Sequence, residues 1–346
     1  MLGPTDSLTI VIGSYLEPDL IARIQAAQPT ARVVYEPDLL PVPRYRCDHN
    51  APPRDLSEAD LDRWRSLTAR ADIFFDFDWL DPRQMVTSRP RLQWIQASSA
   101  GVDVAMRRTG LDGALITVTT AAGIHGGPLA EFALAGVLHF IKGVPDLRRR
   151  QADRRWERYT TRELAGERAL VVGLGGIGRR VTATFAALGV EVTGLGRGGR
   201  AYDLPGLRRV IDRGDLATVL PETGIVIVCC PLTPQTRGLI GREQIALLPP
   251  EAVLVNVGRG QVVDQDALVE ALAAGRLAGA CLDVVTPEPL PADSPLWTMD
   301  NVLLSPHTAS TVVGENARLT ELFIDNLDRF TSGQPLRNVY DPQRGY

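Results

Sequence analysis

A glycine-rich segment in the middle of the chain has the spacing that dinucleotide phosphates need. Residues 173–178 read G-L-G-G-I-G and directly follow the apolar run 169–172. They fit the pattern G-x-G-x-x-G, in which the first glycine makes a tight turn, the second lets the backbone approach phosphate and the third lets a helix pack on the strand. The start of that helix offers free N–H groups and a partial positive charge to an anion. The predicted contacts are Gly173, Gly175, Gly176, Ile177 and Gly178.

The segments downstream decide how much this pattern means, because a glycine pattern alone is a weak signal. They are Val255–Asp264, Ala280–Val284, Pro287–Leu290, Pro295–Trp297 and Asn301–His307. Together with the glycine segment, they closely resemble the D-2-hydroxyacid dehydrogenase family, and the resemblance extends from Trp94 to the last predicted helix. It implies an NAD(P)-dependent oxidoreductase that acts on CH–OH donors, similar to glyoxylate/hydroxypyruvate reductases.

Within this resemblance, the catalytic residues of the family fall on Arg259, Glu288 and His307. Reducing a 2-oxo acid requires a hydride on C2, which the nicotinamide supplies, and a proton on the ketone oxygen. Imidazole is a natural proton donor near neutral pH, and a carboxylate such as that of Glu288 favours the charged ring and fixes its orientation. A guanidinium pairs with a carboxylate through two hydrogen bonds, so Arg259 is expected to anchor the substrate and polarise its carbonyl.

Each catalytic candidate also has a structural interpretation. Arg259 can be a surface residue beside turn glycines, Glu288 an acid in a proline-rich loop, and His307 a hydrogen-bonded histidine at a strand end. Three further histidines are not assigned to catalysis, and one of them, His139, is expected to pack within the long helix. We favour a structural or supporting role for His125, and we expect His49 to be solvated in a polar loop.

The resemblance also assigns contacts outside the catalytic residues. It assigns the substrate carboxylate to the backbone N–H groups of Ser99, Ala100 and Gly101. The resemblance places the loop 231–237 beside the adenine ribose. It assigns Asp283 to the nicotinamide carboxamide. The further expected cofactor contacts are Pro231, Thr236, Val257 and Asp283.

The end of the strand that follows the glycine helix indicates which dinucleotide binds. An NAD enzyme usually ends this strand with an acid that binds the ribose 2′-hydroxyl. Here Gly196 takes that place after the run 190–195, and the next acid is Asp203. Arg197 could grip a 2′-phosphate with two hydrogen bonds, with Arg200 assisting. We therefore predict a preference for NADPH, with NAD still possible, and the alternative is that both arginines face solvent.

The alternation of apolar runs and helical patterns predicts the fold class α/β, with two doubly wound parallel-sheet domains. A flavodoxin-like substrate domain is expected from residues 1–121 and 309–346, and a Rossmann NAD(P)-binding domain from residues 122–308. Residues 125 to about 154 have the spacing of one long helix, and Pro145 within it is of a type that kinks or breaks helices.

The composition argues against several other classes. The chain has 346 residues, 45% of them hydrophobic, a net charge of −4 and no basic stripe, so we expect neither nucleic acid nor membrane as a partner. The four cysteines lack C-x-x-C spacing, which argues against a zinc site or a disulfide framework, and we expect no metal. The first residues show neither a basic nor an apolar leader region, so we expect a cytoplasmic protein.

The resemblance carries two further expectations about partners. In the family the long helix packs in a dimer interface, so we expect a homodimer, with a small 2-oxo or 2-hydroxy acid as substrate. Some relatives instead use nucleotide binding to control protein association. A nucleotide-sensing or corepressor-like binding protein with little turnover is therefore the alternative, and loss of NADPH absorbance with glyoxylate or hydroxypyruvate would separate the two.

Overall fold

The computed structural model describes residues 7–111, 115–198 and 200–342. The chain divides into two compact units: the first unit contains Met1–Ile124 and Thr311–Tyr346, and the second unit contains His125–Ser310. The breaks therefore fall at 124/125 and 310/311, where the sequence predicted 121/122 and 308/309. The segment 1–6, on which the expected lack of a leader rests, lies outside the described residues.

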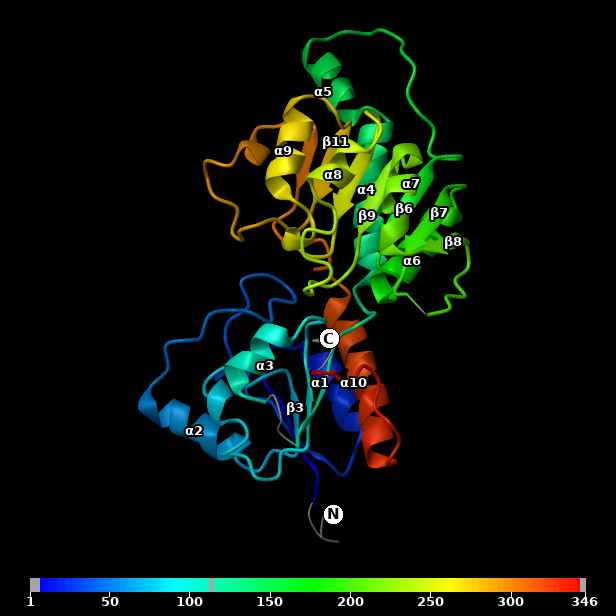
Figure 1. The fold of residues 1–346 in the computed structure, drawn as a ribbon. Helices are drawn as coiled ribbons and strands as arrows, with labels where there is room; N and C mark the ends of the chain where they lie inside the picture. Colours follow the sequence, from blue (N-terminus) through cyan, green and yellow to red (C-terminus); the bar gives the residue numbers. More distant parts are fainter. Residues whose placement is uncertain (1–6, 112–114, 199, 343–346) are drawn as a thin grey trace. The chain divides into compact units, whose positions relative to one another are not determined.

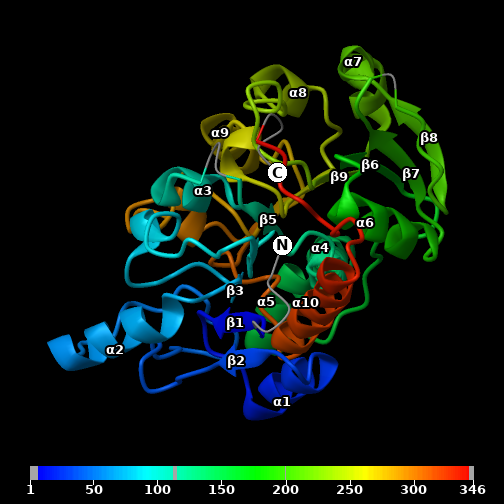
Figure 2. The same cartoon turned by 90° about the horizontal axis from the view of Figure 1, so that it is seen from below.

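The first unit is built on a parallel sheet with the strand order β2-β1-β3-β4-β5, which is the flavodoxin-like order. Its strands are β1 (Thr9–Ile12), β2 (Arg32–Val34), β3 (Ile73–Phe75), β4 (Trp94–Gln96) and β5 (Thr117–Thr119). Its helices are α1 (Pro18–Ala27), α2 (Glu58–Thr68), α3 (Asp103–Thr109) and α10 (Glu315–Thr331). The strands β1, β3 and β4 are buried along their whole length, as parallel strands covered on both faces require. Helices α1 and α10 lie side by side in both views (Figures 1 and 2).

Helix α10 completes the core of the first unit. Phe323 stacks on Trp94 of β4 with ring centroids 5.1 Å apart, and it meets Phe75 of β3 edge to face at 5.4 Å. The buried indole Nε1 of Trp94 donates to Thr119 Oγ1 at 2.8 Å, which satisfies its polar group. The segment after residue 310 therefore belongs with the strands at the start of the chain.

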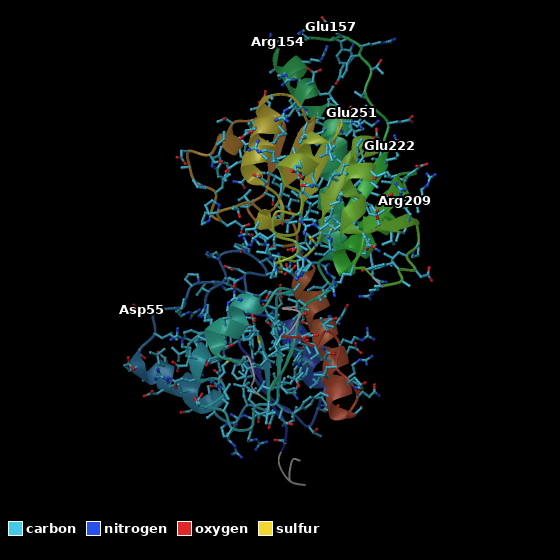
Figure 3. All side chains as sticks on the ribbon, in the orientation of Figure 1. Asp55, Arg154, Glu157, Arg209, Glu222 and Glu251 are labelled. Atoms are coloured by element: carbon cyan, nitrogen blue, oxygen red, sulfur yellow. The ribbon has the colours of Figure 1, made fainter. Side chains whose placement is uncertain are left out.

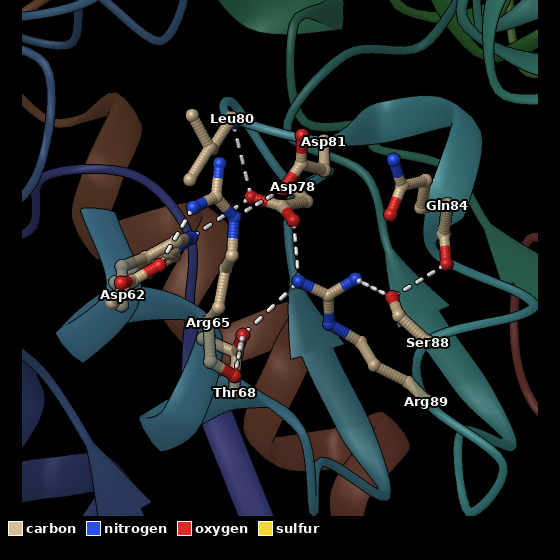
Figure 4. A network of polar contacts seen from close by, with 10 residues as sticks. Asp62, Arg65, Thr68, Asp78, Leu80, Asp81, Gln84, Ser88 and Arg89 are labelled. Carbon is tan, nitrogen blue, oxygen red and sulfur yellow. Dashed lines mark hydrogen bonds and ion pairs between the residues drawn. The ribbon is translucent and has the colours of Figure 1, made fainter. Parts of the chain in front are cut away.

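A buried ion pair in the first unit lies within the segment between β3 and β4 and is hydrogen-bonded to helix α2 (Figure 4). Arg89 pairs with Asp78, and their side chains are 3% and 0% exposed. Asp78 Oδ1 also accepts from Trp64 Nε1 at 3.0 Å and from the backbone N–H of Leu80 at 3.1 Å. Arg89 Nη2 donates to Thr68 Oγ1 at 3.0 Å. Because buried charges need both a partner and hydrogen bonds, this network fixes the loop against α2.

The second unit is built on a larger parallel sheet with the order β12-β11-β10-β9-β6-β7-β8. Its strands are β6 (Arg168–Val172), β7 (Glu191–Leu195), β8 (Leu207–Ile211), β9 (Ile225–Val228), β10 (Val253–Asn256), β11 (Gly279–Leu282) and β12 (Val302–Leu304). Counted from β6, this is the dinucleotide-binding order 3-2-1-4-5-6 with one further strand. Leu170 and Val172 of β6 enter the core on one face of the sheet, and Ala169 and Val171 enter the core on the other. The predicted class, α/β with two doubly wound sheets, is confirmed.

The helices of the second unit include a broken pair where the sequence predicted one long helix. The helices are α4 (Gly126–Ile141), α5 (Val144–Ala152), α6 (Gly176–Ala186), α7 (Leu216–Val219), α8 (Arg242–Ala246) and α9 (Gln265–Ala273). Helices α4 and α5 are bent by 57° relative to each other. Gly143 between them has a φ of 63°, a conformation that glycine adopts readily, and Pro145 falls in the first turn of α5. In the described part of the chain no single helix meets the length and apolarity needed to cross a membrane, and α4 with α5 meets them only as a bent pair.

Strand β8 is an edge of the second sheet, and its side chains are mostly exposed. Arg208 pairs with Glu191 of β7, and Arg209 lies at the same edge (Figure 3). Charged side chains on an edge strand discourage pairing with another chain.

Short 3₁₀ turns occur at η1 (Pro82–Gln84), η2 (Arg213–Asp215), η3 (Leu220–Glu222), η4 (Gly260–Val262) and η5 (Pro295–Trp297).

Candidate active site

The glycine segment lies where β6 passes into α6 in the second unit. Gly173 has a φ of 99°, and a Cβ there would lie 2.8 Å from Cα of Cys230. A Cβ on Gly178 would collide with the carbonyl oxygen of Gly173. The first and third glycines are therefore required by the packing of the turn itself, as the sequence predicted.

The second glycine differs, because the space beside it is open. A Cβ on Gly175 would meet no protein atom within 4 Å. Gly175 is the N-cap of α6, and Gly176 and Ile177 are the first residues of this helix, whose first N–H groups have no partner within the helix. An open approach to free N–H groups at the positive end of a helix fits a pyrophosphate. These residues could therefore hold a dinucleotide through its phosphates.

The catalytic candidates follow three neighbouring strands. β10 pairs with β11, and β11 pairs with β12, all in parallel, so the loops after them leave the same edge of the sheet. Arg259 follows β10, Glu288 lies in the loop after β11, and His307 follows β12. Backbone hydrogen bonds join these loops: the N–H of Asp283 donates to the carbonyl of Asn256 at 3.0 Å.

His307 and Glu288 are in direct contact. Nδ1 of His307 lies 2.8 Å from Oε2 of Glu288, and the side chains are 48% and 38% exposed. A carboxylate only accepts hydrogen bonds, so Nδ1 donates and Nε2 is left for another partner. His307 has a φ of 55°, which is uncommon for a residue with a Cβ and is often found at functional sites.

Asp283 holds the turn that carries His307. Its Oδ1 accepts from Ser305 Oγ at 2.6 Å and from the backbone N–H groups of Thr308 and Ala309, each at 2.9 Å. The carboxylate is buried, and within the described residues no hydrogen bond reaches its Oδ2. The sequence assigned Asp283 to the nicotinamide carboxamide; the structure adds a positioning role and leaves one oxygen for such a contact.

Asn256 positions the turn that carries Arg259. Its Oδ1 accepts from the N–H of Gly258 at 3.0 Å, and its Nδ2 donates to the carbonyl of Arg259 at 3.1 Å. Arg259 Nη1 donates to the carbonyl of Gly258 at 2.8 Å. A Cβ on Gly260 would collide with the carbonyl of Val285, so this turn touches the loop that carries Glu288. Val257, which lies between Asn256 and Gly258, is buried, and its N–H donates to the carbonyl of Val228.

Gln265, at the start of α9, holds the loop of Glu288 from the other side. Its Nε2 donates to the carbonyl of Thr286 at 2.6 Å, and its Oε1 accepts from the N–H of Thr286 at 2.8 Å. The N–H of Val285 donates to Glu288 Oε1 at 3.2 Å. Sequence reasoning missed both Asn256 and Gln265. A polar residue at the end of an apolar strand was a signal for Asn256, whereas nothing in the sequence marked Gln265.

The turn after β7 carries the two arginines predicted to bind a 2′-phosphate. Gly196 follows the strand, and the side chains of Arg197 and Arg200 are exposed. The N–H of Arg197 donates to Tyr202 Oη at 2.9 Å, and the guanidinium of Arg200 lies 5.5 Å from the centre of the Tyr202 ring.

The loop after β9 is held by its own threonines. Thr236 Oγ1 donates to the carbonyl of Pro231 at 2.7 Å and accepts from the N–H of Thr233 at 2.7 Å. The hydroxyl of Thr236 is therefore engaged within the loop, and Pro231 is exposed at its start.

The predicted substrate-binding backbone lies in the first unit, after β4. Ser99 Oγ donates to the carbonyl of Gly101 at 3.2 Å, and the carbonyl of Ser99 accepts from Ala121 at 2.9 Å. Ser99 and Gly101 are exposed, and Ala100 is half-buried. Across the described residues, no cluster of His, Cys, Asp and Glu could hold a metal ion.

One histidine prediction was wrong. His49 is not a solvated loop residue: its Nδ1 lies 3.0 Å from Ser14 Oγ, and its Nε2 lies 2.9 Å from Asn316 Oδ1 of α10. Asn316 donates in turn to Glu17 at 2.9 Å. The histidine thus ties the loop before α2 to helix α10 within the first unit.

Comparisons with known proteins agree with this arrangement. A sequence profile described as "D-isomer specific 2-hydroxyacid dehydrogenase, NAD binding domain" matches residues 134–309. Glyoxylate reductase of Thermofilum pendens is 33% identical over 258 residues, which cover 72% of this chain and 75% of that protein. Glyoxylate/hydroxypyruvate reductase B of Pectobacterium carotovorum is 46% identical over 129 residues, which cover 37% of this chain and 40% of that protein. A crystal structure of a D-isomer specific 2-hydroxyacid dehydrogenase from Xanthobacter autotrophicus Py2, in complex with NADPH and MES, has a TM-score of 0.77 and 32% identity, and the match covers 99% of this chain and 100% of that chain.

Proposed function

The chain belongs to the D-isomer specific 2-hydroxyacid dehydrogenase family, and we propose from this premise that it reduces a small 2-oxo acid, of the glyoxylate or hydroxypyruvate kind, with NADPH. Membership makes it an NAD(P)-dependent enzyme of 2-hydroxyacid reduction. The observation that carries the proposal is the 2.8 Å contact between His307 Nδ1 and Glu288 Oε2, in the same unit as the glycine turn.

His307 is the proposed proton donor. The nicotinamide, when bound, supplies a hydride to C2 of the 2-oxo acid, and negative charge grows on the carbonyl oxygen. His307 gives the proton on Nε2 to that oxygen, which yields the D-2-hydroxy acid and leaves the ring neutral. Glu288 keeps Nδ1 protonated and holds the plane of the ring, and its negative charge stabilises the charged ring before the transfer.

Arg259 is the proposed anchor for the substrate carboxylate. Its guanidinium stays charged at every working pH, and it can also stabilise the charge that grows on the carbonyl oxygen. Asn256 fixes the backbone on both sides of Arg259, so the side chain starts from a rigid turn. The backbone N–H groups of residues 99–101 in the first unit are the proposed second contact for the carboxylate.

The preference for NADPH is proposed from the turn after β7. Gly196 brings no carboxylate to the end of the strand, so nothing at that position repels a 2′-phosphate. Arg197 and Arg200 are both exposed on the same turn. A guanidinium can hold phosphate with two parallel hydrogen bonds, which makes these two residues the proposed 2′-phosphate contacts.

A steady-state comparison of cofactors and substrates tests the function. We expect kcat/KM with NADPH to exceed that with NADH, and glyoxylate or hydroxypyruvate to be turned over faster than bulky 2-oxo acids. Higher kcat/KM with NADH would overturn the cofactor preference. Failure to oxidise NADPH with a broad panel of 2-oxo acids would overturn the enzymatic proposal and favour a nucleotide-sensing protein.

A homodimer remains a proposal that rests on the family resemblance. Light scattering at micromolar concentration is expected to give twice the chain mass of 37.6 kDa. A monomer mass under these conditions would contradict it.

A further inference from the structure

A tyrosine fills the place where an acid would stand at the end of β7. A Cβ on Gly196 would lie 2.6 Å from Cε2 of Tyr202 and 2.8 Å from Cγ1 of Val210. Real Cβ atoms are essentially never found at such distances from other heavy atoms, so a side chain at position 196 requires both the Tyr202 ring and the Val210 methyl to move. An acid placed at this position would therefore meet the packed ring of Tyr202.

The same tyrosine contacts both arginines of the turn. Its hydroxyl oxygen accepts from the backbone N–H of Arg197 at 2.9 Å, which fixes the start of the turn. The guanidinium of Arg200 lies over its ring at 5.5 Å, within the range of a cation–π contact. Tyr202 is half-buried and packs against the core of the second unit, so the turn rests on a rigid support.

We propose that Tyr202 determines cofactor specificity: its ring excludes an acidic side chain from position 196, and its contacts hold Arg197 and Arg200 in place for a ribose 2′-phosphate. This inference rests on the proposed preference for NADPH. Tyr202 acts through its neighbours, so it is a positioning residue. Ordering the two arginines before binding lowers the entropic cost of immobilising them on the phosphate.

One carboxylate lies beside the turn and bears on how the proposal is tested. A Cβ on Gly198 would lie 3.5 Å from Asp212 Oδ1. Asp212 is tied to Asp215 at the start of η2: the backbone N–H of Asp212 donates to Asp215 Oδ2 at 3.0 Å, and the N–H of Asp215 donates to the carbonyl of Asp212 at 3.0 Å. An acid near the turn can accept a hydrogen bond from the ribose 2′-hydroxyl of NAD⁺. The test therefore measures the ratio of the affinities for NADP⁺ and NAD⁺, and not the affinity for NADP⁺ alone.

The first test measures dissociation constants for NADP⁺ and NAD⁺ by titration calorimetry on the full chain. We expect the wild type to bind NADP⁺ more tightly. Loss of the hydroxyl in Tyr202→Phe should lower the preference about threefold, and loss of the ring in Tyr202→Ala should lower it about tenfold, a size typical of one hydrogen bond or one cation–π contact. The affinity for NAD⁺ should change little in either variant.

A matched control removes a similar contact elsewhere in the second unit. The guanidinium of Arg150 lies over the ring of Tyr159 at 4.4 Å, and Tyr159→Ala should leave the ratio unchanged. An unchanged ratio in both Tyr202 variants would overturn the role of Tyr202 while leaving the NADPH preference intact. A wild-type ratio that favours NAD⁺ would overturn the preference itself, and with it this inference.

A second test asks whether the ring excludes an acid. Gly196→Asp should weaken both cofactors in the wild-type background, because the new side chain meets Tyr202. In the double variant Gly196→Asp/Tyr202→Ala the clash with the ring is removed and only the Val210 methyl must still move, so NAD⁺ should bind at least tenfold more tightly than to Gly196→Asp alone. Equal NAD⁺ affinity in the single and double variants, with thermal unfolding showing both folded, would refute the exclusion. If Gly196→Asp does not fold, the two single Tyr202 variants decide the proposal.

Discussion

The backbone N–H of His307 donates to the carbonyl oxygen of Asp283 at 2.9 Å, so the histidine that follows β12 is fixed to the aspartate that follows β11. Oδ1 of the same aspartate accepts from the two residues that follow His307. The ring is thus placed by backbone contacts, and its contact with Glu288 then sets the direction of the ring. Position and orientation are determined by different residues, which makes them separable by mutation.

Removing the imidazole should abolish proton transfer without affecting the cofactor. We expect His307→Ala to lower kcat by roughly 10²- to 10⁴-fold, the range in which general acids contribute, and to leave the dissociation constant of NADP⁺ unchanged. Retained kcat would refute the assignment of the proton donor. His139→Gln is a suitable control, because His139 packs against Phe140 in α4 at 4.9 Å, and it should keep full activity.

Loosening the loop that carries Glu288 should lower kcat even though all the catalytic residues are still present. Gln265→Leu removes both hydrogen bonds to Thr286, and we expect kcat to fall about tenfold, as for outer residues that orient a catalytic group. The affinity for NADP⁺ should stay constant, since no glycine-turn contact changes.

Gln244→Leu provides the matched comparison for Gln265→Leu. Gln244 also bonds to the backbone beside the start of its helix, where its Oε1 accepts from Gly241 at 3.2 Å, and within the described residues its side chain has no hydrogen bond to a catalytic loop. Equal losses of kcat in the two variants would show that Gln265 has only a general structural role.

The buried ion pair of the first unit should be costly to break. Arg89→Leu leaves Asp78 buried without its cation, and we expect the free energy of unfolding to fall by about 3–5 kcal/mol. Arg63→Leu removes an exposed arginine that pairs with Asp38 at 3.1 Å and should cost less than about 1 kcal/mol. Urea unfolding followed by circular dichroism measures both, and similar losses would contradict the buried network as a support of this unit.

Alkaline pH should lower the free energy of unfolding, because the thiol of Cys230 is buried beside the glycine turn. Burial raises the pKa of Cys230, which packs against Gly173, to about 11 from an ordinary value of 9.0. Between these values the unfolded thiol loses its proton while the folded thiol keeps it, so the free energy of unfolding falls as pH rises. The loss approaches about 2–3 kcal/mol above pH 11.

Comparing the wild type with Cys230→Ala isolates this contribution. The variant should show a shallower decline of unfolding free energy between pH 9 and pH 11. Parallel curves would mean that the thiol is accessible to water in the folded protein.

The sequence identifies those parts of the fold and site whose signals are local. An apolar run that ends in a polar residue marks a parallel strand and the edge where its loop begins, whereas the roles expected for Arg259, Asp283 and His307 come from the family resemblance. The glycine turn is equally local, because Gly173 and Gly178 are required by contacts within a few residues or with the adjacent strand end. Both features follow from chemistry that a short window of residues contains.

The parts that the sequence does not predict depend on distant partners. Gln265 is ordinary in type, and its role comes from contacts with Thr286 in the loop after β11, which only the assembled sheet creates. His49 is polar and lies in a polar loop, yet α10, more than 250 residues away, supplies its partner Asn316. Strand β8 has no continuous apolar run, because an edge strand keeps its arginines in water.

Because α10 packs in the first unit, the two units complete their cores at different stages of synthesis. Leu319, Phe323 and Leu327 belong to the core that also contains Trp94, so that core cannot close until nearly the whole chain has left the ribosome. The second unit is one unbroken stretch that is complete before α10 is made. Limited proteolysis of a released fragment that ends at residue 310 should therefore cut the first unit and spare the second. The strands that are translated first therefore complete their core last, and until α10 arrives the aromatic residues that it covers stay open to solvent.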